Sequence, residues 1–94
     1  MTWRLIITPP VQTVLRRLPP DTKRYVRAAF DEICRDPFSG KALHDELAGC
    51  YSFRAKRFRI VYNIHRQTIT VIIVGVGPRK TIYEELTVAI RLRK

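Results

Sequence analysis

The sequence predicts an α+β domain, in which a helical hairpin and a C-terminal helix pack on a mainly antiparallel four-stranded sheet, in the order β-α-α-β-β-β-α. Apolar residues alternate with polar ones in three short segments, and a fourth segment is almost continuously apolar and β-branched. Apolar residues recur with helical spacing in two segments that follow the first strand. The 94 residues, 46% of them hydrophobic, suffice for one modest core, so we expect a single domain over residues 1–94.

The first half of the chain predicts one strand and two helices. Residues 3–7 alternate as a strand does, and Pro9-Pro10 then suits the first turn of a helix. That helix ends at Pro19-Pro20, and a second helix runs from Asp21 to Asp36-Pro37. The expected core residues of the two helices are Val11, Val14, Leu15, Leu18, Val26, Ala29, Phe30 and Ile33. Their basic residues are expected mostly to face water: Arg16, Arg17, Lys23, Arg24, Arg27 and Arg35.

The second half predicts three strands and a last helix. Residues 38–49 have little periodicity and are expected to form a connection. Strands are predicted over 50–55, 58–64 and 68–74, and the composition of the last places it inside the sheet, covered on both faces. We expect Gly75 and Gly77 to end that strand, and residues 82–93 to form a helix.

A tight turn at Lys56-Arg57 has a geometric consequence for two arginines. If the apolar residues of strands 50–55 and 58–64 share a face, a two-residue turn brings Ala55 opposite Phe58. Arg54 then lies directly opposite Arg59 on the other face. Because like charges in that arrangement are destabilising, the pair indicates an anionic ligand such as phosphate.

The charge of the chain points the same way. Eighteen Lys and Arg against eight Asp and Glu leave a net charge of +10, which predicts nucleic acid, an acidic protein segment or an anionic membrane surface as partner. The longest apolar stretch, residues 69–76, is too short to span a membrane, and the N-terminus lacks the apolar length of a signal peptide, so we expect no membrane partner and a cytoplasmic location. Cys34 and Cys50 have no metal-ligand spacing and are expected to be buried thiols.

Three segments of the chain resemble the RelE/ParE toxin superfamily. Residues 47–54 read LAGCYSFR, residues 58–62 read FRIVY and residues 77–83 read GPRKTIY, in the order and spacing of that family. The resemblance covers essentially the whole chain and implies a toxin of a type II toxin–antitoxin system. It implies a metal-independent, cofactor-free endoribonuclease that cuts mRNA, in many relatives on the ribosome, by attack of the 2′-hydroxyl to give a 2′,3′-cyclic phosphate. It also implies an antitoxin, which the charge of this chain predicts to be acidic.

The resemblance assigns roles to four residues of a catalytic site. Arg59 matches the arginine that stabilises the phosphate, Arg79 the proposed general acid or charge stabiliser, and Tyr83 the aromatic that stacks on a base or orients the 2′-hydroxyl. Arg54 stands where these enzymes carry a basic residue for phosphate. Nearby RNA-binding residues are expected to be Lys56, Arg57 and Lys80.

One position departs from the family pattern. Some RelE enzymes have a lysine, proposed as general base, where this chain has Ser52. A serine hydroxyl is too weak a base at neutral pH, so we expect Ser52→Ala to be nearly silent, with Lys56, Lys80 or ribosomal groups left as candidate bases. The missing lysine keeps a second function open, namely a ParE-like toxin that inhibits DNA gyrase and cleaves nothing; a third is a purely regulatory binding domain.

Overall fold

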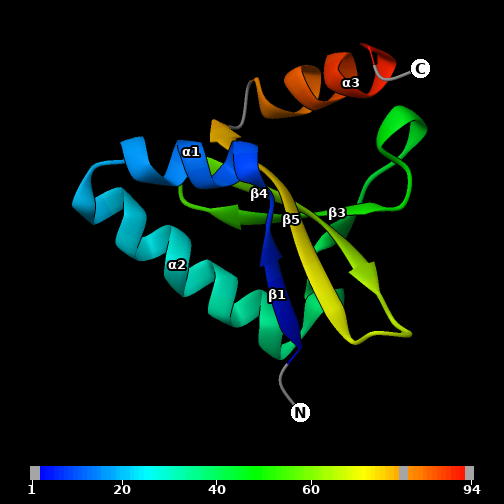
Figure 1. Cartoon of the computed structure of the whole chain (residues 1–94), viewed down its shortest axis with the longest axis horizontal. Coiled ribbons are helices and arrows are strands. Elements are labelled where there is room, and N and C mark those ends of the chain that lie inside the picture. The colour runs from blue at the N-terminus through cyan, green and yellow to red at the C-terminus, as the bar shows by residue number, and fades with distance from the viewer. Residues whose placement is uncertain (1–2, 79–80, 93–94) are drawn as a thin grey trace.

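A computed structural model describes residues 3–78 and 81–92 and has the expected α+β architecture (Figure 1). Its helices are α1 (Pro9–Arg17), α2 (Pro20–Arg35) and α3 (Ile82–Leu92). Its strands are β1 (Arg4–Ile7), β2 (Lys41–Ala42), β3 (Cys50–Ala55), β4 (Phe58–His65) and β5 (Thr70–Pro78). Short 3-10 turns at Pro37–Ser39 and Asp45–Leu47 lie in the connection between α2 and β3.

Prolines begin both helices of the hairpin; this was expected of α1, whereas α2 was expected to begin at Asp21 and begins at Pro20 instead. Pro9 and Pro10 occupy the first turn of α1, and Pro20 begins α2, where the missing proline N–H removes no helical hydrogen bond. The backbone N–H of Leu18 bonds to the carbonyl of Leu15 and ends α1. At the end of α2 the carboxylate of Asp36 accepts a hydrogen bond from the N–H of Phe38, at 3.2 Å, and turns the chain away.

The sheet has five strands in the order β1-β5-β4-β3-β2, rather than the four expected. The additional strand, β2, has only two residues, which pair with Ser52 and Tyr51, and so short a segment shows no periodicity in sequence. β1 pairs with β5 in parallel, and the other pairs are antiparallel. β5 is flanked by β1 and β4, so its predicted interior position is confirmed.

The predicted end of β5 was wrong. Gly75 and Gly77 do not end the strand but lie inside it, and β5 continues to Pro78. Between the pairs Val61–Gly75 and Tyr62–Ile73 the register shifts by one residue, which leaves Val74 without a cross-strand partner. Because this bulge reverses the alternation, Ile73 and Val76 are both buried on the same side of the sheet.

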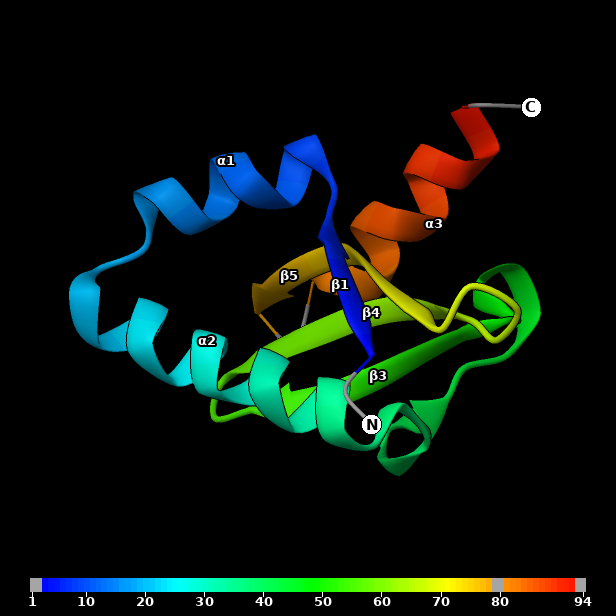
Figure 2. The same cartoon turned by 60° about the horizontal axis from the view of Figure 1, so that its bottom comes forward.

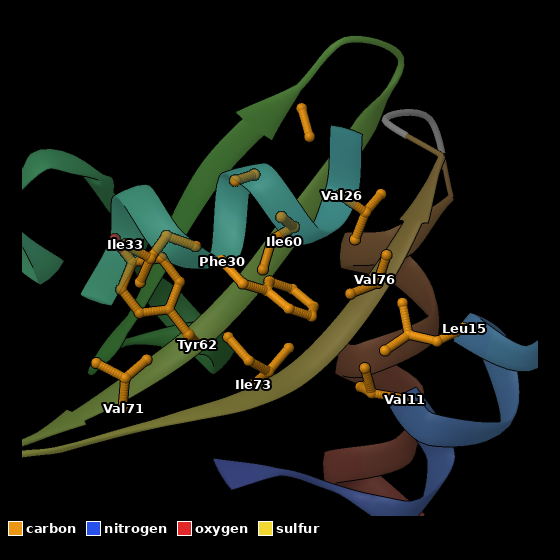
Figure 3. Packing of buried hydrophobic residues seen from close by; sticks show 12 residues of the cluster. Val11, Leu15, Val26, Phe30, Ile33, Ile60, Tyr62, Val71, Ile73 and Val76 are labelled. Atoms are coloured by element: carbon orange, nitrogen blue, oxygen red, sulfur yellow. The ribbon is translucent and has the colours of Figure 1, made fainter. Parts of the chain in front are cut away.

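The main core lies between the helical hairpin and one face of the sheet (Figure 3). Figure 3 shows Val11 and Leu15 of α1 beside Val76, and Phe30 of α2 among the strand residues. Val14 and Leu18 are half-buried, and the other predicted core positions of the hairpin are buried. The hydroxyl of the fully buried Tyr62 donates to the carbonyl of Pro37 at 2.7 Å, and this hydrogen bond ties the connection to the sheet.

Helix α3 packs on the other face of the sheet. Figures 1 and 2 show α2 and α3 on opposite sides of the strands. The sheet therefore separates a layer built by the hairpin from a more open face that carries α3 and the expected site. Among the described residues, no helix has the length and apolar character required to cross a membrane.

Candidate active site

Arg54 and Arg59 lie directly opposite each other on β3 and β4, as the turn geometry predicted. Arg59 is also paired with Gly77 of β5, so both arginines lie on the face that carries α3. Arg54 is exposed, and its Nε donates to the carbonyl of Lys56 at 3.2 Å. That bond holds the Arg54 side chain near the turn and leaves its terminal nitrogens available for an anion.

Arg59 is the more enclosed of the two arginines. Its side chain is half-buried, and its Nε is buried and has no hydrogen-bond partner among the described residues. A buried donor on a charged group is unfavourable unless it meets an acceptor. Phosphate oxygens match the planar fork of the guanidinium, and they could reach the buried Nε only if the Arg59 side chain moved.

Tyr83 and Ser52 meet beside the arginine pair. The Oγ of the buried Ser52 lies 2.6 Å from the phenol oxygen of Tyr83, in the first turn of α3. Ser52 is opposite Val61 on β4, two residues along from Arg59, on the same face of the sheet. The hydrogen bond therefore positions the half-buried ring of Tyr83 over the face that carries the arginines.

The glycines of β5 allow α3 to approach the sheet closely. A Cβ at position 75 would lie 2.8 Å from Cδ1 of Leu86, and one at position 77 would lie 3.0 Å from Cδ1 of Ile82. Side chains at these two positions would force the Leu86 and Ile82 side chains of α3 to shift. The lack of side chains at Gly75 and Gly77 thus lets α3 pack closely on β5. The low strand propensity of glycine does not indicate this role.

The other expected site residues are arranged differently. Lys56 has a positive φ of 54° in the β3–β4 turn, and its ammonium lies 4.7 Å from the ring centroid of Tyr25 on α2, away from the arginine face. Arg57 is exposed in the same turn. Arg79 and Lys80 lie outside the described residues.

Two contacts near this face were not foreseen. The carboxylate of Glu46 accepts from the guanidinium of Arg91 on α3 at 2.8 Å, and both side chains are largely exposed. Cys50 donates from Sγ to Oδ1 of Asn63 at 3.1 Å, beneath α3. No local pattern pairs Glu46 with Arg91, whereas Cys50 lies opposite Asn63 in the same register that pairs Arg54 with Arg59.

Cys34 and Cys50 are free, and Cys34 is buried whereas Cys50 is half-buried. Burial raises the pKa of both thiols, and the negative charge of Asp31 adds to the rise at Cys34. Both thiols therefore stay protonated at neutral pH and are poor nucleophiles. Within the described part of the chain, no group of three or more His, Cys, Asp or Glu side chains is arranged to hold a metal ion.

The chain is similar to known toxins over nearly its whole length. Residues 5–83 match the family described as "ParE toxin of type II toxin-antitoxin system, parDE". Toxin RelG of Mycobacterium tuberculosis is 35% identical over 85 residues, which cover 88% of this chain and 98% of RelG.

Solved structures show the same relationship. A chain of the RelBE2 toxin–antitoxin complex of M. tuberculosis superposes with a TM-score of 0.78 at 33% identity, covering 84% of this chain and 100% of that one. A chain of the archaeal RelE–RelB complex of Pyrococcus horikoshii superposes with a TM-score of 0.72 at 22% identity, covering 86% of this chain and 99% of the archaeal one. This match shows the fold alone.

Fold and matches together define a toxin of a type II toxin–antitoxin system. The chain belongs to the RelE/ParE toxin superfamily, and its relationship to RelG at 35% identity indicates the RelE-like branch.

Proposed function

We propose that this toxin is a metal-independent endoribonuclease that cleaves mRNA, on the ribosome, through the arginine face beside α3. The observation that supports this most is the Arg54–Arg59 pair, in which two cations face each other and the buried Nε of Arg59 has no protein acceptor among the described residues. The relative RelG and the RelE toxins, which share this fold, support the same class of activity.

The proposed reaction is an in-line transfer at phosphorus. The 2′-oxygen of the ribose bonds to the adjacent phosphorus, the bond from phosphorus to the 5′-oxygen breaks, and a 2′,3′-cyclic phosphate and a 5′-hydroxyl result. A base takes the proton of the 2′-hydroxyl, and an acid gives a proton to the departing 5′-oxygen. Negative charge grows on the non-bridging oxygens during this step, and Arg59 and Arg54 neutralise it.

The remaining roles follow from the resemblance and from the geometry of the site. Tyr83, held by Ser52, stacks on a base or orients the 2′-hydroxyl. Arg79 is proposed as general acid or charge stabiliser. Lys56, Arg57 and Lys80 are proposed to bind RNA, and Lys56 would have to leave the Tyr25 ring to act as a base at the arginine pair.

A cognate antitoxin is the proposed protein partner. Relatives have been solved as RelBE2, archaeal RelE–RelB and E. coli RelBE complexes. The net charge of +10 predicts an acidic antitoxin segment over the cationic surface, which would make the free toxin and the cytoplasmic complex differ strongly in charge.

A ParE-like function is the second candidate, because the matching family is described by ParE. Purified toxin incubated with translating ribosomes, followed by mapping of RNA ends, separates the two functions. Cleavage that leaves cyclic phosphate, and that is lost in Arg59→Ala but kept in the surface control Arg35→Ala, supports the ribonuclease. Intact RNA together with inhibited DNA gyrase would support the ParE-like function.

A further inference from the structure

A second cationic site lies between the two helices of the hairpin. A cleft of about 340 Å³ is lined by Ile7 of β1, by residues of α1 and by residues of α2. The lining side chains of the helices are Gln12, Leu15, Arg16, Lys23 and Arg27. Since α1 and α2 cover the face of the sheet opposite α3, this cleft is separate from the arginine site (Figure 2).

The three cations of this cleft are arranged unfavourably for the protein alone. Lys23 and Arg27 are four residues apart on α2 and so share one side of the helix, where like charges repel. Lys23 is also near the N-terminus of α2, where the helix dipole disfavours a positive charge. Arg16 approaches from α1, and Lys23 is half-buried, which weakens the screening of its charge by water.

Asp31 is four residues after Arg27 on α2, but it does not line the cleft and forms no ion pair with Arg27. No acidic residue lines the cleft, and among the described residues none of the three cations forms an ion pair with a protein carboxylate. Gln12 uses one of the two N–H groups of its side-chain amide to donate to the carbonyl of Ile7 at 2.9 Å, so the charged side-chain donors in the cleft are all cationic. Such a set of donors suits a ligand that carries only acceptor oxygens and negative charge.

We propose that this cleft binds phosphate groups of an RNA backbone, in a segment of RNA other than the one that is cleaved. This proposal rests on the proposed ribonuclease function and extends it to the recognition of a larger RNA. The lining favours RNA over an acidic antitoxin segment, because Ile7 and the buried Leu15 are its only apolar side chains. A docked peptide needs apolar anchor pockets, whereas phosphate contacts need only cations.

Because of its position, the cleft distinguishes a large folded RNA from a short single strand. A short single strand that occupies the arginine site lies on the α3 face and leaves the cleft on the other face free. A large folded RNA can contact both faces of a domain whose dimensions are 34 × 33 × 22 Å. The cleft therefore adds affinity for folded RNA and has no part in the chemical step on a short substrate.

A pair of charge-matched double variants tests this proposal. Lys23→Gln/Arg27→Gln removes two cations of the cleft, and Arg24→Gln/Arg35→Gln removes two exposed cations of the same helix outside it. Binding of each protein to a long 2′-O-methyl RNA hairpin, which cannot be cleaved, is measured by fluorescence anisotropy over a salt series. Single-turnover cleavage of a short single-stranded RNA is measured in parallel, and thermal unfolding verifies the fold.

The cleft variant is expected to bind the hairpin at least 10-fold more weakly and to reduce the salt slope by about 0.7–0.9 per lost phosphate contact. Its cleavage of the short RNA should remain within twofold of the wild type, and the control should keep its hairpin affinity within about threefold. Equal losses in both variants would show a general charge effect and overturn the proposal. Unchanged hairpin binding with weakened antitoxin binding would overturn it in favour of a peptide site. A wild type that cleaves neither the short RNA nor mRNA on translating ribosomes refutes the ribonuclease, and the hairpin affinities still decide whether the cleft binds RNA.

Discussion

Ser52 on β3 and Tyr83 on α3 share a hydrogen bond of 2.6 Å between their hydroxyl oxygens, across 31 positions of sequence. Ser52 stands where some RelE enzymes have a lysine. Its hydroxyl is too weak a base to replace that lysine, but Ser52 has another role here. It connects α3 to the sheet at the edge of the arginine face, and thereby orients the ring that is expected to contact RNA.

This contact changes the effect expected of Ser52→Ala. We expect a small loss of cleavage, about 3- to 10-fold, because the Tyr83 ring loses its orientation while the arginines remain; one neutral hydrogen bond contributes about 0.5–1.5 kcal/mol. Tyr83→Phe removes the same bond from the other side. In single-turnover cleavage, the double variant should be no worse than the more damaging single variant. Additive losses would contradict the positioning role of Ser52.

Arg59→Ala should reduce cleavage far more than Arg54→Ala. The half-buried charge of Arg59 is less screened by water than the charge of Arg54, which is exposed. We expect a loss of 10²–10³-fold for Arg59, the magnitude typical of one charge-stabilising donor, and a smaller loss for Arg54. Folding should survive both changes, since neither residue belongs to the core. Equal losses in single-turnover assays would contradict the ranking.

Tyr62 predicts a decline of stability in alkaline solution. Burial raises its pKa to about 12 from the ordinary value of 10.0, so the fold favours the protonated phenol. The stabilisation is fully present below pH 10 and is lost as pH rises through about 12, at up to about 1.4 kcal/mol per pH unit. Urea unfolding over this range should show the decline. Tyr62→Phe should be less stable at neutral pH, because the Pro37 carbonyl loses its donor, but its stability should fall less steeply with pH.

The backbone conformation of Ile69 predicts how two substitutions outside the site differ in stability. Ile69 precedes β5 with a φ of 51°, a conformation that is unfavourable for a β-branched residue. Ile69→Gly and Ile69→Ala remove the same partly exposed side chain, but only glycine also removes the Cβ that clashes in this conformation. We expect the glycine variant to be about 1 kcal/mol more stable than the alanine variant, as measured by thermal unfolding. A more stable alanine variant would contradict the positive φ.

Local patterns determined the elements and the arginine pair. Proline positions and apolar spacing predicted both hairpin helices to within a few residues, because they act through neighbouring backbone. Strict alternation along two strands joined by a two-residue turn leaves one register, and that register brings Arg54 opposite Arg59.

Some features depend on how closely separate elements approach one another, and only the tertiary structure decided these. Gly75 and Gly77 predict a strand end if only local propensity counts, yet they lie within β5, where they pair with Val61 and Arg59 of β4 and α3 packs on them. The Ser52–Tyr83 bond and the cationic cleft between α1 and α2 likewise join side chains of separate elements, which no periodicity relates. Sequence spacing determines which face of an element a residue occupies, whereas the partner it meets there depends on packing between elements distant in the chain.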